Sequence, residues 1–136
     1  MMKSNESKQD YLERILMLEQ YSDKIKAIQL AKSFNFSRAS ISIALKKLID
    51  EGYVLIDSSQ NISLTEEGRK IAEKVYERHQ LLTEVFIHIG VDRKTAASDA
   101  CKLEHDLSDE TYNAIKKYYK DKVNNDIWIK YSFKVK

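Results

Sequence analysis

The sequence contains few of the residues that interrupt helices. It has no proline and only three glycines among 136 residues. Because the turns of all-β proteins depend on these two residue types, their scarcity argues against a β-sandwich and favours long helices.

Other absences narrow the class of protein. A single cysteine, Cys101, excludes an intramolecular disulfide bond. No apolar run approaches the roughly 20 residues of a membrane-spanning helix, and the N-terminus lacks the basic and then apolar pattern of a signal peptide. We therefore expect a soluble, cytoplasmic protein of one domain or two small ones, with no membrane partner.

The formal net charge of +2 conceals charged blocks of opposite sign. Residues 24–53 carry six Lys or Arg against two acidic residues, whereas residues 54–115 carry seven against twelve. A local basic block in a nearly neutral protein is typical of a surface that binds anions, most often nucleic acid. A solvated helix surface has the same composition, so charge alone leaves both interpretations open.

The N-terminal half has the pattern of a winged helix-turn-helix. Apolar spacing predicts helices over 9–20, 27–34 and 38–51, with Ser37 as the N-cap of the third and Gly52 at its end. Two short helices joined by a tight turn, the second basic and rich in serine, favour a helix-turn-helix. Apolar residues on both sides of the polar turn 58–61 then predict a two-stranded hairpin, the wing.

The C-terminal half is predicted to be helical. Thr65 is a suitable N-cap for a helix that continues to about residue 89 and is ended by Gly90. Its predicted apolar side comprises Ile71, Val75, Leu82, Val85, Phe86 and Ile89. Further helices are expected over 93–106 and 109–120, and the alternation over 127–136 is a strand signal.

The expected fold is therefore mainly α, with three parts along the chain. Residues 1–65 form the winged helix-turn-helix, 66–120 form an all-helical domain, and 121–136 form a lysine-rich tail that contains the strand signal.

DNA contacts are expected from the start of the third helix. The candidate residues are Ser37, Arg38, Ser40, Ser42, Lys46 and Lys47. Arg38 is the best candidate for reading a guanine edge, while the lysines face phosphates. The wing tip, residues 58–61, lacks positive charge and is expected to contribute little.

Candidate metal ligands lie at helical spacing in three places. Cys101, Glu104 and His105 would share one face of the helix expected over 93–106. A thiolate, a carboxylate and an imidazole on one face suit a divalent first-row metal. Asp10 and Glu13 form a second pair on one face, and His79 lies within the long helix. Taken singly, each feature also fits a solvated acidic face or an ordinary packed cysteine or histidine.

Five motifs, in order and spacing, resemble a known family. They are Asp10 to Ile15 (DYLERI), Leu48 to Val54 (LIDEGYV), Leu64 to Gly68 (LTEEG), Arg78 to Leu82 (RHQLL) and Ala100 to Ser108 (ACKLEHDLS). Over residues 9 to about 119 the chain resembles the diphtheria toxin repressor family and its shorter relatives, the manganese transport regulators.

The resemblance implies a repressor that binds double-stranded operator DNA as a homodimer through the helical domain and controls metal-uptake genes. It also implies one or two Mn(II) or Fe(II) ions per subunit and no organic cofactor. By position, the implied metal ligands are Asp10, Glu13, His79, Cys101, Glu104 and His105. A bound ion would then crosslink the DNA-binding half and the helical half, so metal would act as a positional switch.

The sequence departs from the family pattern at several positions. Cys101 stands where manganese regulators have Glu, and Asp10 stands where iron-type members have Met, so the chain is a hybrid of the two types. Ala39 and Ile43 stand where Pro and Gln are frequent, which leaves the operator sequence open. Thr83 and Ser98 fall near positions where ancillary ligands would be expected, and we expect a protein of the short type without the SH3-like third domain of the long iron-type proteins.

Two other functions were weighed. A winged-helix regulator that responds to an organic ligand or to oxidation of Cys101 would need an exposed, low-pKa thiolate and neither Asp10 nor Glu13. A metallohydrolase would need an open coordination position, a general base and a substrate cleft, and no motif supplies them. We therefore expect a protein that is not an enzyme.

Overall fold

The computed structural model describes residues 4–122, which divide into two compact units that meet at Glu73 and Lys74. The strand signal over 127–136 lies outside the described residues. None of the described helices is both long enough and apolar enough to cross a membrane.

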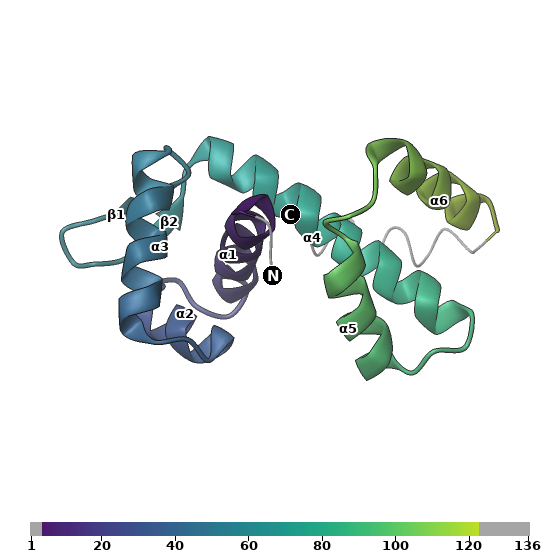
Figure 1. Ribbon diagram of the computed structural model, residues 1–136, viewed down its shortest axis with the longest axis horizontal. Coiled ribbons are helices and arrows are strands. Elements are labelled where there is room, and N and C mark those ends of the chain that lie inside the picture. Colours follow the sequence, from purple (N-terminus) through teal and green to yellow (C-terminus); the bar gives the residue numbers. More distant parts are fainter. Residues whose placement is uncertain (1–3, 123–136) are drawn as a thin grey trace. The chain divides into compact units, whose positions relative to one another are not determined.

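The first unit has the order of elements of a winged helix-turn-helix (Figure 1). Its elements are α1 (Ser4–Glu19), α2 (Ala27–Phe34), α3 (Arg38–Asp50), β1 (Val54–Ile56), β2 (Ile62–Leu64) and the beginning of α4 (Glu66–His88). The two strands pair antiparallel, with Val54 opposite Leu64 and Ile56 opposite Ile62. The mainly helical fold class and the predicted hairpin are confirmed.

Local contacts explain where α3 begins and ends. The Ser37 hydroxyl accepts a hydrogen bond from the Ser40 amide at 3.1 Å, which satisfies one of the unpaired donors at the N-terminus of α3. Gly52 follows the C-terminus of α3 with φ +86°, a conformation that a side chain disfavours. Both predicted boundaries are therefore confirmed.

Thr65 joins the wing to α4. Its hydroxyl oxygen accepts from the Gly68 amide at 3.0 Å and donates to the Gly52 carbonyl at 2.7 Å. A Cβ atom on Gly68 would lie 2.1 Å from the Tyr53 carbonyl oxygen. The helix can therefore begin against this loop only because position 68 has no side chain.

The core of the first unit is contributed by all of its elements. Its most deeply buried apolar residues are Leu12, Ile15, Ile25, Leu30, Ile41 and Val54. The α4 residue Arg69 also makes a bidentate ion pair with Glu19 of α1, at 2.9 and 3.0 Å. Burial and this pair hold α1 and the start of α4 in the first unit.

The second unit contains the rest of α4, then α5 (Arg93–Leu103) and α6 (Asp109–Lys122). Leu81, Tyr112 and Tyr119 form a buried cluster with Val85 packed against it. The prediction for Ile89 was wrong, because this side chain is 72% exposed. The reason is that α4 ends at His88, so Ile89 lies in the turn before Gly90, whose φ is +111°.

Candidate metal centre and nucleic-acid interface

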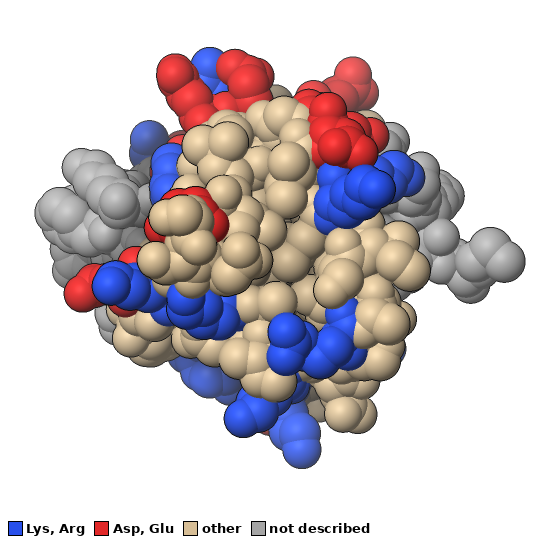
Figure 2. All heavy atoms as spheres, turned by 90° about the vertical axis from the view of Figure 1, so that its left-hand side faces the viewer, with Lys and Arg blue, Asp and Glu red and all other residues tan. Residues whose placement is uncertain are grey.

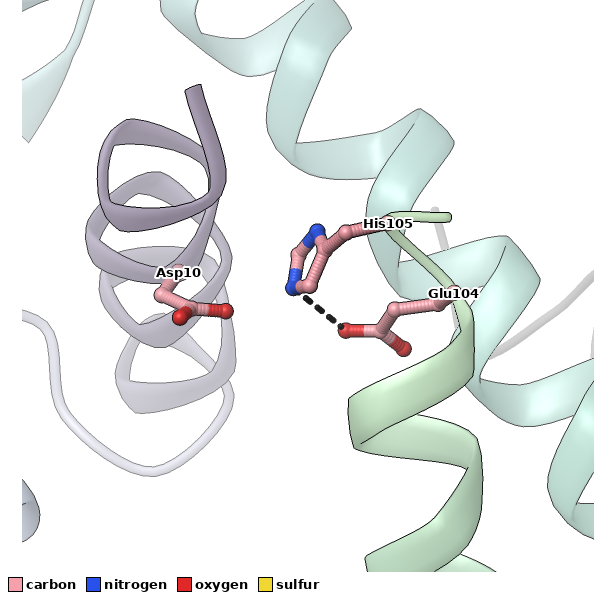
Figure 3. A group of neighbouring side chains, drawn as sticks. All are labelled: Asp10, Glu104 and His105. Carbon is pink, nitrogen blue, oxygen red and sulfur yellow. Dashed lines mark ion pairs between the residues drawn. The ribbon is translucent and has the colours of Figure 1, made fainter. Parts of the chain in front are cut away.

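Three predicted ligands meet in the second unit, around the carboxylate of Glu104. This side chain is fully buried. Its Oε2 lies 3.1 Å from Nδ1 of His79, and its Oε1 lies 3.5 Å from Nε2 of His105. Figure 3 shows the Glu104 and His105 side chains pointing toward each other. A buried carboxylate thus faces two imidazoles, one with each of its oxygens.

The two ligands at positions 104 and 105 do not lie on a helix. The expected helix over 93–106 ends at Leu103, so the prediction that Cys101, Glu104 and His105 share one helical face was wrong. Cys101 is exposed in the last turn of α5 and lies outside the groups of convergent ligand atoms found among residues 4–122. The structure therefore brings His79, Glu104 and His105 together, and the groups of convergent ligand atoms among the described residues do not include the Cys101 thiol.

Arg78 provides the physical reason for the early end of α5. Its Nη1 donates to the carbonyl oxygens of Glu104 at 3.3 Å and Leu107 at 2.8 Å. In a continuing helix the Glu104 carbonyl would instead accept from the amide of Ser108. Ser108 itself caps the next helix, because its hydroxyl accepts from the Thr111 amide at 3.1 Å. The chain between Leu103 and Asp109 therefore forms a turn, here called the ligand turn (residues 104–108).

Arg78 is the residue to which sequence analysis assigned no role. It is only 7% exposed, its guanidinium lies 4.6 Å from the ring centre of Tyr112, and it pairs with Asp109. A buried arginine needs hydrogen-bond acceptors or anions as partners. Because Arg78 directly precedes the predicted ligand His79, its partners are expected close to the candidate metal site. This adjacency is the one sequence signal that could have found it.

Asp10 and Glu13 lie one turn apart in α1, as predicted. Glu13 is 6% exposed and Asp10, drawn on α1 in Figure 3, is partly buried. Removing a carboxylate from water is costly unless cations or donors compensate for it. α1 thus carries two carboxylates that are withdrawn from water, one buried and one partly buried.

The donors of this centre fit a divalent first-row metal ion. The second unit offers two imidazoles and one carboxylate. Oxygen and nitrogen ligands of this kind suit manganese and iron, and a fully buried anionic side chain between two imidazoles suits a cation.

All six predicted DNA-contacting residues lie on the outside of the first unit. Ser37, Arg38, Ser40, Ser42, Lys46 and Lys47 are exposed. Figure 2 shows this side of the DNA-binding unit, with most Lys and Arg side chains across its middle and lower part and Asp and Glu mainly at its upper edge. The Lys26 ammonium donates to the Ser59 carbonyl, so one positive charge reaches the wing tip from another element. Because 33 positions separate these residues, no local sequence pattern indicates this contact.

Comparison with known proteins identifies both units. Residues 3–60 match the family described as "Iron dependent repressor, N-terminal DNA binding domain". Residues 65–125 match "Iron dependent repressor, metal binding and dimerisation domain". The fold and both matches define a winged helix-turn-helix regulator with a helical metal-binding domain.

Relatives agree with this class. The chain is 39% identical over 124 residues to an uncharacterized HTH-type transcriptional regulator of Methanocaldococcus jannaschii, covering 88% of this chain and 99% of that protein. It is 30% identical over 107 residues to the transcriptional regulator MntR of Escherichia coli, covering 79% of this chain and 69% of that protein.

A solved structure also resembles most of this chain. It is a manganese-dependent transcriptional repressor in complex with manganese, with 30% identity and a TM-score of 0.74 over 82% of this chain. The present chain spans about half of that protein, 51% of its length. The chain therefore belongs to the iron-dependent repressor family and is a metal-dependent transcriptional repressor.

Proposed function

We propose that this repressor binds double-stranded operator DNA as a homodimer when it is loaded with Mn²⁺ or Fe²⁺, and that it controls genes for metal uptake. The matched DNA-binding and dimerisation domains support the partners, and the manganese complex of a relative supports the metal. Such a protein acts by binding DNA in the cytoplasm, so we propose no catalytic activity.

The buried carboxylate of Glu104 between His79 and His105 is the observation that carries the proposal. These three residues are the proposed ligands from the second unit. Asp10 and Glu13 are proposed from α1, because they match the family motif and share one face of that helix. Cys101 is the sixth proposed ligand, and we expect it to contribute least because its thiol is exposed in the last turn of α5.

The same donors favour manganese as the activating ion. Carboxylates and imidazoles suit Mn²⁺, whereas a thiolate shifts preference toward Fe²⁺, Co²⁺ or Zn²⁺. Each oxygen of Glu104 faces a different imidazole, which supports two ions per subunit sharing this carboxylate. We therefore propose Mn²⁺ as the physiological ion, with Fe²⁺ as its competitor.

The proposed ligand set belongs to both the DNA-binding unit and the helical unit. Binding of metal would then favour one arrangement of the two recognition helices in the dimer, which must reach half-sites about one DNA turn apart. A shift from mostly inactive to mostly active protein needs roughly 3 to 5 kcal/mol of differential affinity. A chelate of five or six donors supplies more than that.

The test is a DNA-binding titration with and without metal. Protein treated with EDTA is mixed with duplexes selected from a random pool, and binding is measured as Mn²⁺ or Fe²⁺ is added without oxygen. We expect binding to require metal and His79→Ala to abolish this dependence. The matched control is His88→Ala, which removes an exposed histidine from the same helix, one whose ring forms a T-shaped pair with Tyr119.

The outcomes separate the competing functions. Equal DNA binding without metal would contradict the proposal, and a response to thiol oxidation in its place would favour the redox alternative. Loss of metal dependence in His88→Ala to the same degree as in His79→Ala would contradict the ligand assignment. Sedimentation of each variant checks that the homodimer persists.

A further inference from the structure

The outward face of α3 carries an isoleucine that the core does not use. Ile43 is 74% exposed, although its neighbours Ile41 and Leu45 are buried. At 3.6 residues per turn, Ile43 points about 200° around the helix from Ile41, directly away from the core. Isoleucine is also a weaker helix former than alanine or leucine, so neither packing nor helix propensity accounts for it at this position.

Two lysines lie beside Ile43 on the same face. Lys46 and Lys47 follow it by one turn and the small Ala39 precedes it by one turn, all of them exposed. Positions three and four residues apart are neighbours on a helix surface. Ile43 is therefore an apolar centre with two ammonium groups beside it. The ammonium groups suit the phosphates of a polyanion, and Ile43 suits an apolar group that lies between those phosphates. An apolar protein surface would leave the two ammonium groups without anionic partners.

Duplex DNA presents one such group in the major groove, the 5-methyl of thymine. We infer that Ile43 is a specificity-determining residue that contacts a thymine methyl in each half-site of the operator. This inference rests on the proposed function, since it takes α3 as the helix that enters the groove. The sixth residue of a 13-residue helix lies in its N-terminal half, from which recognition helices reach base edges.

The contact discriminates by apolar burial. A methyl group removed from water against the isoleucine strengthens binding by roughly 0.8 kcal/mol, which is about fourfold. Cytosine, which lacks the methyl group, and the purines, which present N7 acceptors at that place, would leave the isoleucine against polar groups. We therefore expect the selected duplexes to be enriched in thymine at one position of each half-site.

The experiment replaces thymine by deoxyuridine, which removes only the methyl group. Full-length protein loaded with Mn²⁺ selects duplexes from a random pool, and each thymine of the selected sequence is then exchanged singly. We expect one position in each half-site at which the exchange weakens binding about fourfold. Ile43→Ala should bind the thymine and deoxyuridine duplexes equally well.

Two further variants sharpen the result. Ile89→Ala removes an isoleucine of nearly equal exposure, 72%, from the second unit and should keep the fourfold ratio. Ile43→Gln, whose amide pairs with adenine, should select duplexes in which adenine replaces that thymine. Circular dichroism verifies that each variant is folded, as expected for substitutions of exposed residues.

The failures are distinguishable. If the wild-type protein selects no duplex in a metal-dependent manner, the proposed function fails and the inference with it. If it selects duplexes but no thymine is sensitive to deoxyuridine, or if Ile43→Ala keeps the sensitivity, the inference alone is overturned. A change of oligomeric state in Ile43→Ala with unchanged sensitivity would assign Ile43 to contact with a second copy of the chain, which also overturns it.

Discussion

The start of α3 and the ligand turn (residues 104–108) both follow short helices, but they are held in different ways. Ser37 caps α3 with a hydroxyl only three residues from its partner amide. The ligand turn depends on Arg78, which is 26 residues from Glu104 and 29 from Leu107. The start of α3, where the proposed DNA contacts lie, is therefore built locally, whereas the candidate metal centre depends on a distant side chain. A single substitution should consequently damage the second more than the first.

Arg78→Ala is expected to have the largest effect. It leaves the Glu104 and Leu107 carbonyls without their buried donor and removes one of the two cations paired with Asp109, the other being Lys74. We expect a loss of about 3 kcal/mol in the free energy of unfolding. Manganese affinity should fall by about 10- to 100-fold, because Arg78 holds the turn that carries two proposed ligands.

The measurements for Arg78 are urea unfolding and calorimetric titration with Mn²⁺. Arg78→Lys serves as the matched variant, since it keeps the charge but cannot reach two carbonyls with a fixed fork of donors. Unchanged manganese affinity in folded Arg78→Ala would show that the ligand turn keeps its shape without this side chain.

Gly68→Ala should have an intermediate effect confined to stability. The added Cβ would meet the Tyr53 carbonyl oxygen at 2.1 Å, so the start of α4 or the loop must move. The better helix propensity of alanine offsets less than 1 kcal/mol, and a net loss of about 2 kcal/mol is expected. Urea unfolding measures it, with the exposed Lys70→Ala as control. A stabilised Gly68→Ala protein would refute the close contact.

Cys101→Ser should have the smallest effect. The thiol is exposed and no described group of convergent ligand atoms includes it, so unfolding and activation by Mn²⁺ should both change little. Any loss should be larger for Co²⁺ or Fe²⁺, which bind thiolates better than Mn²⁺ does. Activation curves for the three metals provide the measurement. A loss of manganese activation equal to that of His79→Ala would make Cys101 a principal ligand.

The contrast between the two segments also explains what could be predicted from the sequence. The caps Ser37 and Thr65 and the turn glycine Gly52 act on their immediate neighbours, so the boundaries of α3 and the start of α4 follow from local patterns. The end of α5 depends on Arg78, and no local pattern after Leu103 contains a proline or glycine that would end the helix. Helical spacing therefore extended α5 too far and placed Cys101 beside Glu104 and His105.

The sequence predicted which residues form the candidate site better than it predicted how these residues are arranged in space. Spacing and family motifs selected His79, Glu104 and His105, and these three residues converge in the structure. Their convergence requires the pairing of α4 with the segment after α5, which no periodicity encodes. The contribution of Lys26 to the wing tip was missed for the same reason.

The hydrogen bonds of the Thr65 hydroxyl affect which changes of sequence the wing can accept during evolution. Thr65 follows β2, and its hydroxyl donates to the carbonyl of Gly52, which precedes β1. The same hydroxyl accepts from the Gly68 amide in α4, so one side chain connects both ends of the hairpin to the helix. The polar tip between the strands lies beyond that connection and is exposed. Insertions or new charges at residues 58–60 therefore leave the attachment of the hairpin intact, because an exposed loop tip tolerates them. The wing tip can therefore vary in length and charge among related repressors, which would change its contacts with DNA, while the packing that positions α3 stays the same.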